Sequence, residues 1–349
     1  MIPVFDGHND FIQRVVAAGE DGARIWLEGD GTGHLDLPRA RAGGLVGGFF
    51  ALWVPSPANP NDVESIALMQ DPPFHLPLPD EIAHDSALPF AFRQAAALKM
   101  LERTGTLEVV TSATGLRRAI AENRFAAVMH MEGAEAIRDM DALHLWHAAG
   151  LRSLGPVWSR PTAYGEGVPF AYPAGPDIGA GLTPQGRDLV RECNVLRIML
   201  DLSHLNEAGF DDVARLSDAP LVASHSCVHA ICPSARNLTD RQLQVIRDSG
   251  GLVGLNYASS FLREDGKRLP LKGFDTILRH LDRLLAVLGE DGVGLGSDFD
   301  GALMPEELAD AAALPALIRA MEAHGYGDAL IRKIAGENWI SLLARVWGN

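Results

Sequence analysis

The sequence predicts an α/β fold, a single (β/α)8 or TIM barrel, and three observations predict it. Short apolar runs that stop at Gly or a polar residue occur eight times, which is typical of buried parallel strands. Helical patterns lie between most of these runs, as right-handed strand–helix–strand crossovers require. The length of 349 residues suits one barrel with insertions. Eight units at this length favour a closed barrel over a doubly wound sheet.

Each expected strand is a short apolar run, and each expected helix carries apolar residues three or four positions apart. In chain order, the strands are expected at Pro3–Asp6, Val46–Trp53, Ala126–Met131, Ser153–Val157, Ile198–Leu202, Leu221–Ser224, Leu252–Asn256 and Gly292–Gly296. The helices are expected at Leu88–Arg103, Thr114–Glu122, Met140–Ala149, Thr183–Glu192, Glu207–Leu216, Thr239–Asp248, Phe274–Leu288, Leu314–His324 and Asp328–Trp347.

Two segments interrupt this alternation. Residues 55–89 are rich in Pro, Asp and Asn, and residues 161–183 are rich in Gly, Pro and aromatic residues. Both follow a strand, so we expect them on the carboxyl-terminal face of the barrel, where barrel active sites lie. Because no repeat or linker is present, residues 1–349 are expected to form one catalytic domain with these two insertions.

Composition excludes several classes of partner. The net charge of −15 argues against nucleic acid and anionic membranes. No apolar run reaches the length of a membrane span, and the segment Met1–Asp6 lacks the features of a signal peptide. Three cysteines without a CxxC pair favour a reducing compartment. We therefore expect a cytoplasmic protein, and the sequence leaves a homodimer open.

Polar side chains that can bind metal follow five of the expected strands. The first strand runs into Asp6-Gly7-His8-Asn9-Asp10, where His8 and Asp10 are two apart and share a face. Strand ends in a closed barrel surround one cavity, so we expect all five groups to converge there. The candidates are His8 with Asp10, Glu132, His204, His225 and Asp298.

Three imidazoles and two carboxylates are a donor set that suits two zinc ions. Glu132 has two oxygens and can bridge, so His8 and Asp10 would complete one metal site and His204 and His225 the other. Asp298 is then left over as a proton carrier. Each residue taken singly has a structural interpretation, since an acid after a strand often caps the next helix. Convergence at five strand ends favours the metal site.

Seven sequence blocks run in order from the first strand to the last helix. Together they resemble the renal (membrane) dipeptidase family of zinc metallopeptidases, within the amidohydrolase superfamily, over the whole chain. The blocks are Asp6-Gly7-His8-Asn9-Asp10, Met131-Glu132-Gly133, Asp201-Leu202-Ser203-His204, Ser224-His225-Ser226, Ser234-Ala235-Arg236-Asn237, Gly296-Ser297-Asp298-Phe299-Asp300-Gly301 and Gly336-Glu337-Asn338.

The resemblance implies a dinuclear zinc dipeptidase that cleaves dipeptides with a free C-terminal carboxylate, L-Xaa-D-Xaa dipeptides included. It implies two Zn²⁺ per chain, bridged by Glu132 and by a water or hydroxide. His8 and Asp10 would bind one ion, and His204 and His225 the other. Asp298 resembles the acid that takes a proton from the bridging water and passes it to the leaving amine. Arg236 resembles the residue that holds the substrate carboxylate, a task that suits a planar guanidinium fork.

Two positions depart from the better-known members of this family. Trp158 stands where they carry a His that touches the substrate carbonyl oxygen, and an indole donates one hydrogen bond but takes up no proton. We interpret Trp158 as a substrate-binding residue, with Arg160 as a candidate to supply charge in place of the His. Glu135 stands where mammalian members have a His.

These departures keep two alternatives open. The same metals can serve another hydrolase, such as an N-acyl amino acid hydrolase, a lactonase or a deaminase-like enzyme, which a panel of dipeptides and acylated amino acids separates from a dipeptidase. Alternatively, the barrel is a binding protein without activity, which a metal assay tests.

Overall fold

The computed structural model describes residues 1–56 and 62–348. Eight of its strands make up the barrel wall. They are β1 (Val4–Asn9), β2 (Leu45–Trp53), β5 (Phe125–Glu132), β6 (Leu151–Gly155), β8 (Met199–Leu200), β9 (Val222–Ser226), β10 (Leu252–Asn256) and β11 (Val293–Gly296).

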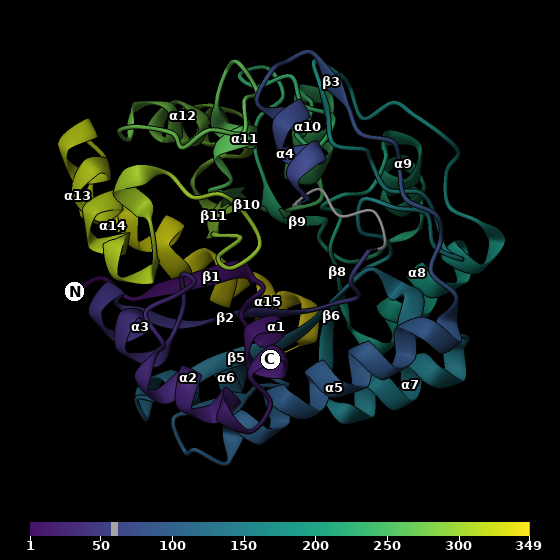
Figure 1. The fold of residues 1–349 in the computed structure, drawn as a ribbon, viewed down its shortest axis with the longest axis horizontal. Helices are drawn as coiled ribbons and strands as arrows, with labels where there is room; N and C mark the ends of the chain where they lie inside the picture. Colours follow the sequence, from purple (N-terminus) through teal and green to yellow (C-terminus); the bar gives the residue numbers. More distant parts are fainter. Residues whose placement is uncertain (57–61, 349) are drawn as a thin grey trace.

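These strands are parallel and closed into a ring, with helices around it (Figure 1). Neighbours follow the order β8-β6-β5-β2-β1-β11-β10-β9, and a parallel bridge between Asp201 and Val222 joins the two ends of that order. Each predicted strand overlaps one strand of the ring. The predicted (β/α)8 barrel is therefore confirmed.

Most of the helices overlap a helix that the sequence pattern predicts. Helices α7, α9 and α13 have the expected bounds, whereas α1 to α3 between the first two strands, α4 and α11 were not predicted. The helices are α1 (Phe11–Ala18), α2 (Gly22–Glu28), α3 (Leu37–Gly43), α4 (Val63–Met69), α5 (His84–Glu102), α6 (Ala113–Ala121), α7 (Met140–Ala149), α8 (Pro184–Leu196), α9 (Glu207–Leu216), α10 (Asp240–Asp248), α11 (Ser259–Leu262), α12 (Asp275–Leu288), α13 (Leu314–His324), α14 (Asp328–Arg332) and α15 (Asn338–Trp347).

The expected last helix is divided by a π-helical turn over Lys333–Glu337. Trp339 follows this turn in α15 and is completely buried. Its Nε1 donates to the carbonyl of Leu295 at 2.9 Å, and a Cβ at Gly294 of β11 would lie 2.6 Å from that nitrogen. The strand therefore needs Gly there to make room for the indole. Trp339 fills the barrel interior and leaves the carboxyl ends of the strands for the site.

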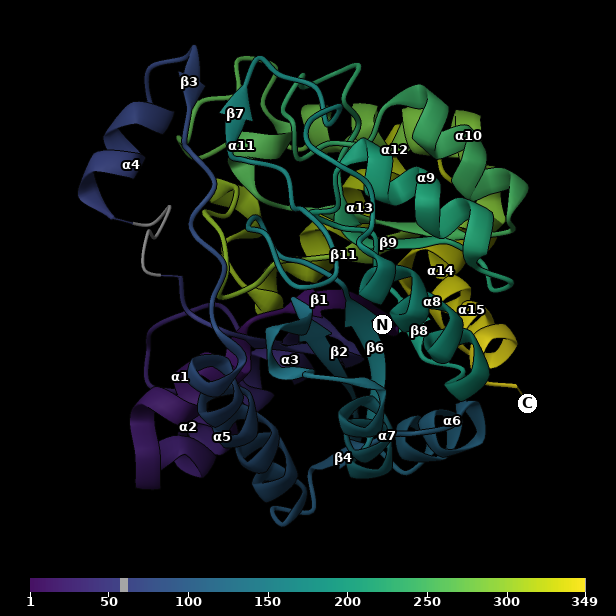
Figure 2. The same ribbon diagram turned by 90° about the vertical axis from the view of Figure 1, so that its right-hand side faces the viewer.

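The two insertions pair with each other. Strand β3 (Phe74–His75) in the first pairs antiparallel with β7 (Ala171–Tyr172) in the second, and Figure 2 shows them side by side at the same end of the barrel. The first insertion also contains α4, and α5 begins within its expected range; residues 57–61 lie outside the described part of the chain. One further strand, β4 (Leu107–Val109), pairs with β5 outside the ring. Strands this short give too little alternation to be recognised from sequence.

A capping box begins α10 directly after the Ser234–Asn237 loop. The Thr239 hydroxyl accepts from the backbone N–H of Gln242, and the Gln242 side chain accepts from the N–H of Thr239. We expect Thr239→Ala to lower the free energy of unfolding by about 1 kcal/mol, measured by urea denaturation. Arg247→Ala on the exposed face of the same helix is the control and should change it by less than about 0.5 kcal/mol. Equal effects of the two substitutions would contradict a role for the cap.

Candidate metal centre

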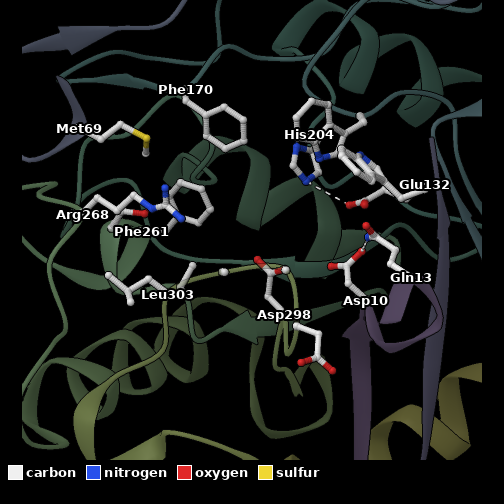
Figure 3. Close-up of a pocket in the computed structure, with 17 residues that line it drawn as sticks. Asp10, Gln13, Met69, Glu132, Phe170, His204, Phe261, Arg268, Asp298 and Leu303 are labelled. Atoms are coloured by element: carbon white, nitrogen blue, oxygen red, sulfur yellow. Dashed lines mark hydrogen bonds and ion pairs between the residues drawn. The ribbon is translucent and has the colours of Figure 1, made fainter. Parts of the chain in front are cut away.

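The predicted ligand residues all lie at carboxyl ends of barrel strands, and all are at most 9% exposed. Apolar strand residues fix the backbone, and polar residues at or just beyond the strand ends point into the cavity at this end. Figure 3 shows Asp10, Glu132, His204 and Asp298 directed at a common space. His8 lies in β1, Asp10 just after it, Glu132 ends β5, His204 follows β8, His225 lies in β9 and Asp298 follows β11.

Glu132 stands at the centre of this cluster. Its Oε1 lies 3.2 Å from His204 Nε2, 3.3 Å from His225 Nε2 and 3.6 Å from His8 Nε2. His8 Nε2 also lies 3.5 Å from Asp10 Oδ2. Two groups of potential metal ligands therefore share Glu132, one with His8 and Asp10 and one with His204 and His225.

The electrostatics of the cluster favour a bound cation. Burial lowers the pKa of His204 and His225 well below the usual range, so both rings are neutral, the form in which imidazole binds metal. Burial raises the pKa of Glu132 to about 8. Burial also lowers the pKa of His8, but the charges of Glu132 and Asp10 outweigh it and raise that pKa to about 10. These carboxylates therefore stabilise a positive charge at the position of His8.

The donor atoms fit a metal ion for a second reason. Neither ring nitrogen of His8 has a hydrogen-bond partner among the described residues, although both are buried. The other two imidazoles are each oriented by a serine, because Ser159 Oγ lies 2.8 Å from Nδ1 of His204 and Ser224 Oγ lies 2.8 Å from Nδ1 of His225. Such contacts leave Nε2 free to face a metal. The Ser224 hydroxyl in turn donates to Asp201.

Asp298 lies beside the ligand cluster but is held differently. Its Oδ2 accepts a hydrogen bond of 2.9 Å from the Asn256 amide at the end of β10. Burial raises the pKa of Asp298 above the usual value for Asp. Asp298 and His204 both have left-handed backbone conformations, with φ of 61° and 67°. Such angles are uncommon outside glycine and cluster at functional sites.

A pocket opens beside the cluster. Asp10, Glu132, Trp158, His204 and Asp298 line its inner part. Phe170, Phe261, Met69, Leu303 and Arg268 form the opposite wall in Figure 3.

Trp158 lines this pocket, whereas Arg236 lies behind its wall. The Trp158 ring lies in the wall, 5.8 Å from the ring of His204. Arg236 is 3% exposed and lies behind the wall, with its guanidinium carbon 5.8 Å from the ring of Phe261. Arg236 donates to Ser226 Oγ at 2.9 Å and to the carbonyl of His225 at 2.8 Å.

Comparison with known proteins identifies the family. The model of the membrane dipeptidases, peptidase family M19, matches residues 1–349. The chain belongs to this family. The resemblance predicted from the motifs is therefore confirmed, and this M19 chain is a metallodipeptidase.

Solved structures and curated relatives agree with this assignment. The M19 chain is 58% identical to a metallopeptidase from Rhodobacter sphaeroides, solved with a phosphinate mimic of the dipeptide L-Ala-D-Ala, and the match covers 99% of each chain with a TM-score of 0.97. The dipeptidase AC is also 58% identical, with a TM-score of 0.96 over 100% of this chain and 99% of the other. Dipeptidase tcpJ of Claviceps purpurea is 27% identical, over 98% of this chain and 76% of its own length.

Several residues of the M19 site were not predicted. Gln13 donates to Asp10 Oδ1 at 2.6 Å, and it was missed because α1 was missed. Asn256 was visible as the polar end of the seventh expected strand, yet it received no role. Arg160, which was expected as a candidate charge at the substrate, is instead completely buried and paired with Glu135.

The helices in the described part of the chain include none with the length and apolar character of a membrane span.

Proposed function

We propose that this M19 metallodipeptidase is a dinuclear zinc enzyme that cleaves dipeptides with a free C-terminal carboxylate, L-Xaa-D-Xaa dipeptides included. The observation that carries the proposal is the position of Glu132 Oε1, which is shared by both groups of ligands. The relative from Rhodobacter sphaeroides, solved with a mimic of L-Ala-D-Ala, supports the choice of substrate.

We assign His8, Asp10 and Glu132 to one zinc ion, and Glu132, His204 and His225 to the other. Two adjacent zinc ions supply a water that ionises near neutral pH and a Lewis acid for the scissile carbonyl. Histidine and carboxylate donors are the ones zinc prefers.

Asp298 is left to move the proton. Its Oδ2 is occupied by the Asn256 amide, so Oδ1 is the atom available to accept a proton and then deliver it to the leaving nitrogen. Burial raises the pKa of Asp298. This shift towards neutral pH suits both steps, because the group must take up a proton and then release it.

The substrate contacts are assigned to residues of the pocket wall and to Arg236 behind it. Trp158 offers a flat wall with one donor, and Phe170 and Phe261 extend the apolar surface away from the metals. We assign the substrate carboxylate to Arg236, whose guanidinium uses two of its five N–H groups on Ser226 and His225.

Other features of the chain remain predictions. We propose that residues 1–349 form one barrel domain with two insertions. A cytoplasmic location is supported by three unpaired, buried cysteines, which accord with a reducing compartment. The homodimer left open by the sequence is tested by the molar mass in solution.

Metal analysis is the first test. We expect about two zinc ions per chain after metal-replete expression, measured by inductively coupled plasma mass spectrometry. Glu132→Gln should lower the content of both sites, whereas Glu192→Gln at a distant ion pair with His144 should leave it unchanged. Fewer than one tightly held metal in the wild-type protein would contradict a dinuclear site.

The choice of substrate needs a separate measurement. We expect kcat/KM for dipeptides, with L or D residues at the second position, to exceed that for N-acyl amino acids and lactones of similar size. A panel of these compounds, assayed on the zinc-loaded enzyme, decides the point. Faster turnover of N-acyl amino acids would refute the proposed substrate class.

A further inference from the structure

A buried ion pair joins the loops that follow β5 and β6. Arg160 Nε donates to Glu135 Oε1 at 2.6 Å, and neither side chain has any exposed surface. Arg160 also donates through Nη2 to the carbonyl of Val54, just after β2, at 2.8 Å. The pair therefore ties together the carboxyl ends of three neighbouring strands. Burying two charges is costly, and apolar residues could fill the same space.

The acidic partner lies against the segment that carries the proposed bridging ligand. Glu135 comes three residues after Glu132, and its carboxylate folds back onto the turn between them. A Cβ at Gly133 would lie 2.5 Å from Glu135 Oε2, and Gly133 has a φ of 90°. Glycine is therefore needed at this turn. The Glu135 carboxylate packs directly against the backbone that follows Glu132.

The basic partner lies in a loop whose three consecutive side chains point to three different places. Trp158 lines the pocket, Ser159 contacts Nδ1 of His204 at 2.8 Å, and Arg160 turns back to Glu135. The loop is tight, because the N–H of Arg160 donates to the carbonyl of Trp158 at 2.8 Å. A Cβ at Gly167 would lie 1.8 Å from that same carbonyl oxygen. Movement of Arg160 would therefore move the other two side chains.

Arg160 also touches the pocket wall from behind. Its guanidinium carbon lies 5.4 Å from the centre of the Trp158 ring, within the range of a cation–π contact. Trp53 and Phe170 contact the same indole at centroid distances of 5.3 and 5.7 Å. The indole is thus held by aromatic rings and by one guanidinium that the Glu135 carboxylate fixes.

We propose that Glu135 and Arg160 are positioning residues for the dipeptidase reaction. The pair sets the place of the Trp158 ring, and through it the place of the substrate relative to His204. A planar fork is required, because one side chain must meet a ring face, a carboxylate and a carbonyl at once. This inference rests on the proposed function of Trp158 as part of the substrate site.

The decisive variant removes both charges together. Replacing a buried pair by apolar residues is often neutral for stability, so Glu135→Met/Arg160→Met should fold with a melting temperature near that of wild type. Its kcat/KM for L-Ala-D-Ala should nevertheless fall by about 10-fold to 100-fold, as for a substrate misplaced by about 1 Å. A rise in KM should account for more of this fall than a decrease in kcat. If the double variant is as stable as the wild-type protein and has the wild-type kcat/KM, the proposal is overturned.

A double-mutant cycle tests whether the pair acts through Trp158. Arg160→Lys keeps the charge and removes the fork, so it remains useful if the Met variants fold poorly. Its loss of kcat/KM should be several-fold smaller in a Trp158→Ala background than in the wild-type background. An equal loss in both backgrounds would overturn the proposal. Arg241→Met, which removes an exposed pair with Glu207 and Asp211, is the control and should leave kcat/KM unchanged.

Zinc content is measured for every variant, and rates are expressed per loaded site. The proposed function itself is tested by the wild-type enzyme, through its zinc content and its rate on dipeptides. An unchanged KM for Trp158→Ala alone would refute the assignment of Trp158 to the substrate site. The two proposals therefore fail through different measurements.

Discussion

Asp298→Asn is expected to retain both metal ions and to lose a factor of roughly 10²–10⁴ in kcat. The substitution keeps the shape of the side chain, and the new amide oxygen can still accept from Asn256, which donates to Asp298 at 2.9 Å. What disappears is a group that takes up and releases a proton at Oδ1. The measurements are kcat on a dipeptide and metal content of the same preparation.

The control for this variant is the same chemical change at a remote place. Asp282→Asn alters an exposed carboxylate that contacts His324 and Tyr326, and it should leave kcat unchanged. Loss of zinc from Asp298→Asn would contradict the proton-carrier role, because it would make Asp298 a ligand.

The second large effect is expected from the substrate rather than the enzyme. Amidating the C-terminus of a dipeptide removes the negative charge proposed to pair with Arg236, and leaves a buried guanidinium without this partner. Losses of this kind cost about 2–5 kcal/mol, or roughly a 30-fold to 5000-fold fall in kcat/KM. The guanidinium is positioned for this by its contacts with Ser226 and His225. Its Nε has no hydrogen-bond partner among the described residues.

The matched experiment varies enzyme and substrate together. Arg236→Met should lower kcat/KM for the free dipeptide by a similar factor, and should lower it much less for the amide. The four values of kcat/KM, for acid and amide on both enzymes, form a double-mutant cycle. Equal rates for acid and amide on the wild-type enzyme would refute carboxylate recognition.

The convergence of the potential metal ligands could be predicted because it depends on strand ends, and strand ends are visible in a sequence. The apolar runs before His225 and Asp298 place these side chains at one end of a closed barrel, so convergence follows from the fold class. Short elements were not predictable in this way. Helix α1 has eight residues and is followed by further short helices, and missing it concealed Gln13.

The surroundings of the cluster depend on loop conformation, which no periodicity reveals. Sequence position suggested Arg160 as a charge at the substrate, two residues after Trp158. The tight turn at these residues sends the guanidinium to Glu135 instead, 2.6 Å away. Similarly, nothing in the sequence shows that Arg236 lies behind the pocket wall. Both facts depend on which way a loop side chain points.

The closure of the barrel has a consequence for how the protein is made. Asp6 in β1 accepts hydrogen bonds from the backbone and hydroxyl of Ser297, beyond β11, at 2.6 and 2.8 Å. The first and the eighth strands of the wall meet there, 291 residues apart in sequence. Contacts between such distant segments form slowly. Asp298 can therefore join the proposed ligands His8 and Asp10 only after the eighth strand of the wall has left the ribosome.

A metal ion that binds the closed barrel more tightly than the open chain would stabilise closure by mass action. The supply of metal during synthesis would then govern the yield of folded protein as well as the activity of each molecule.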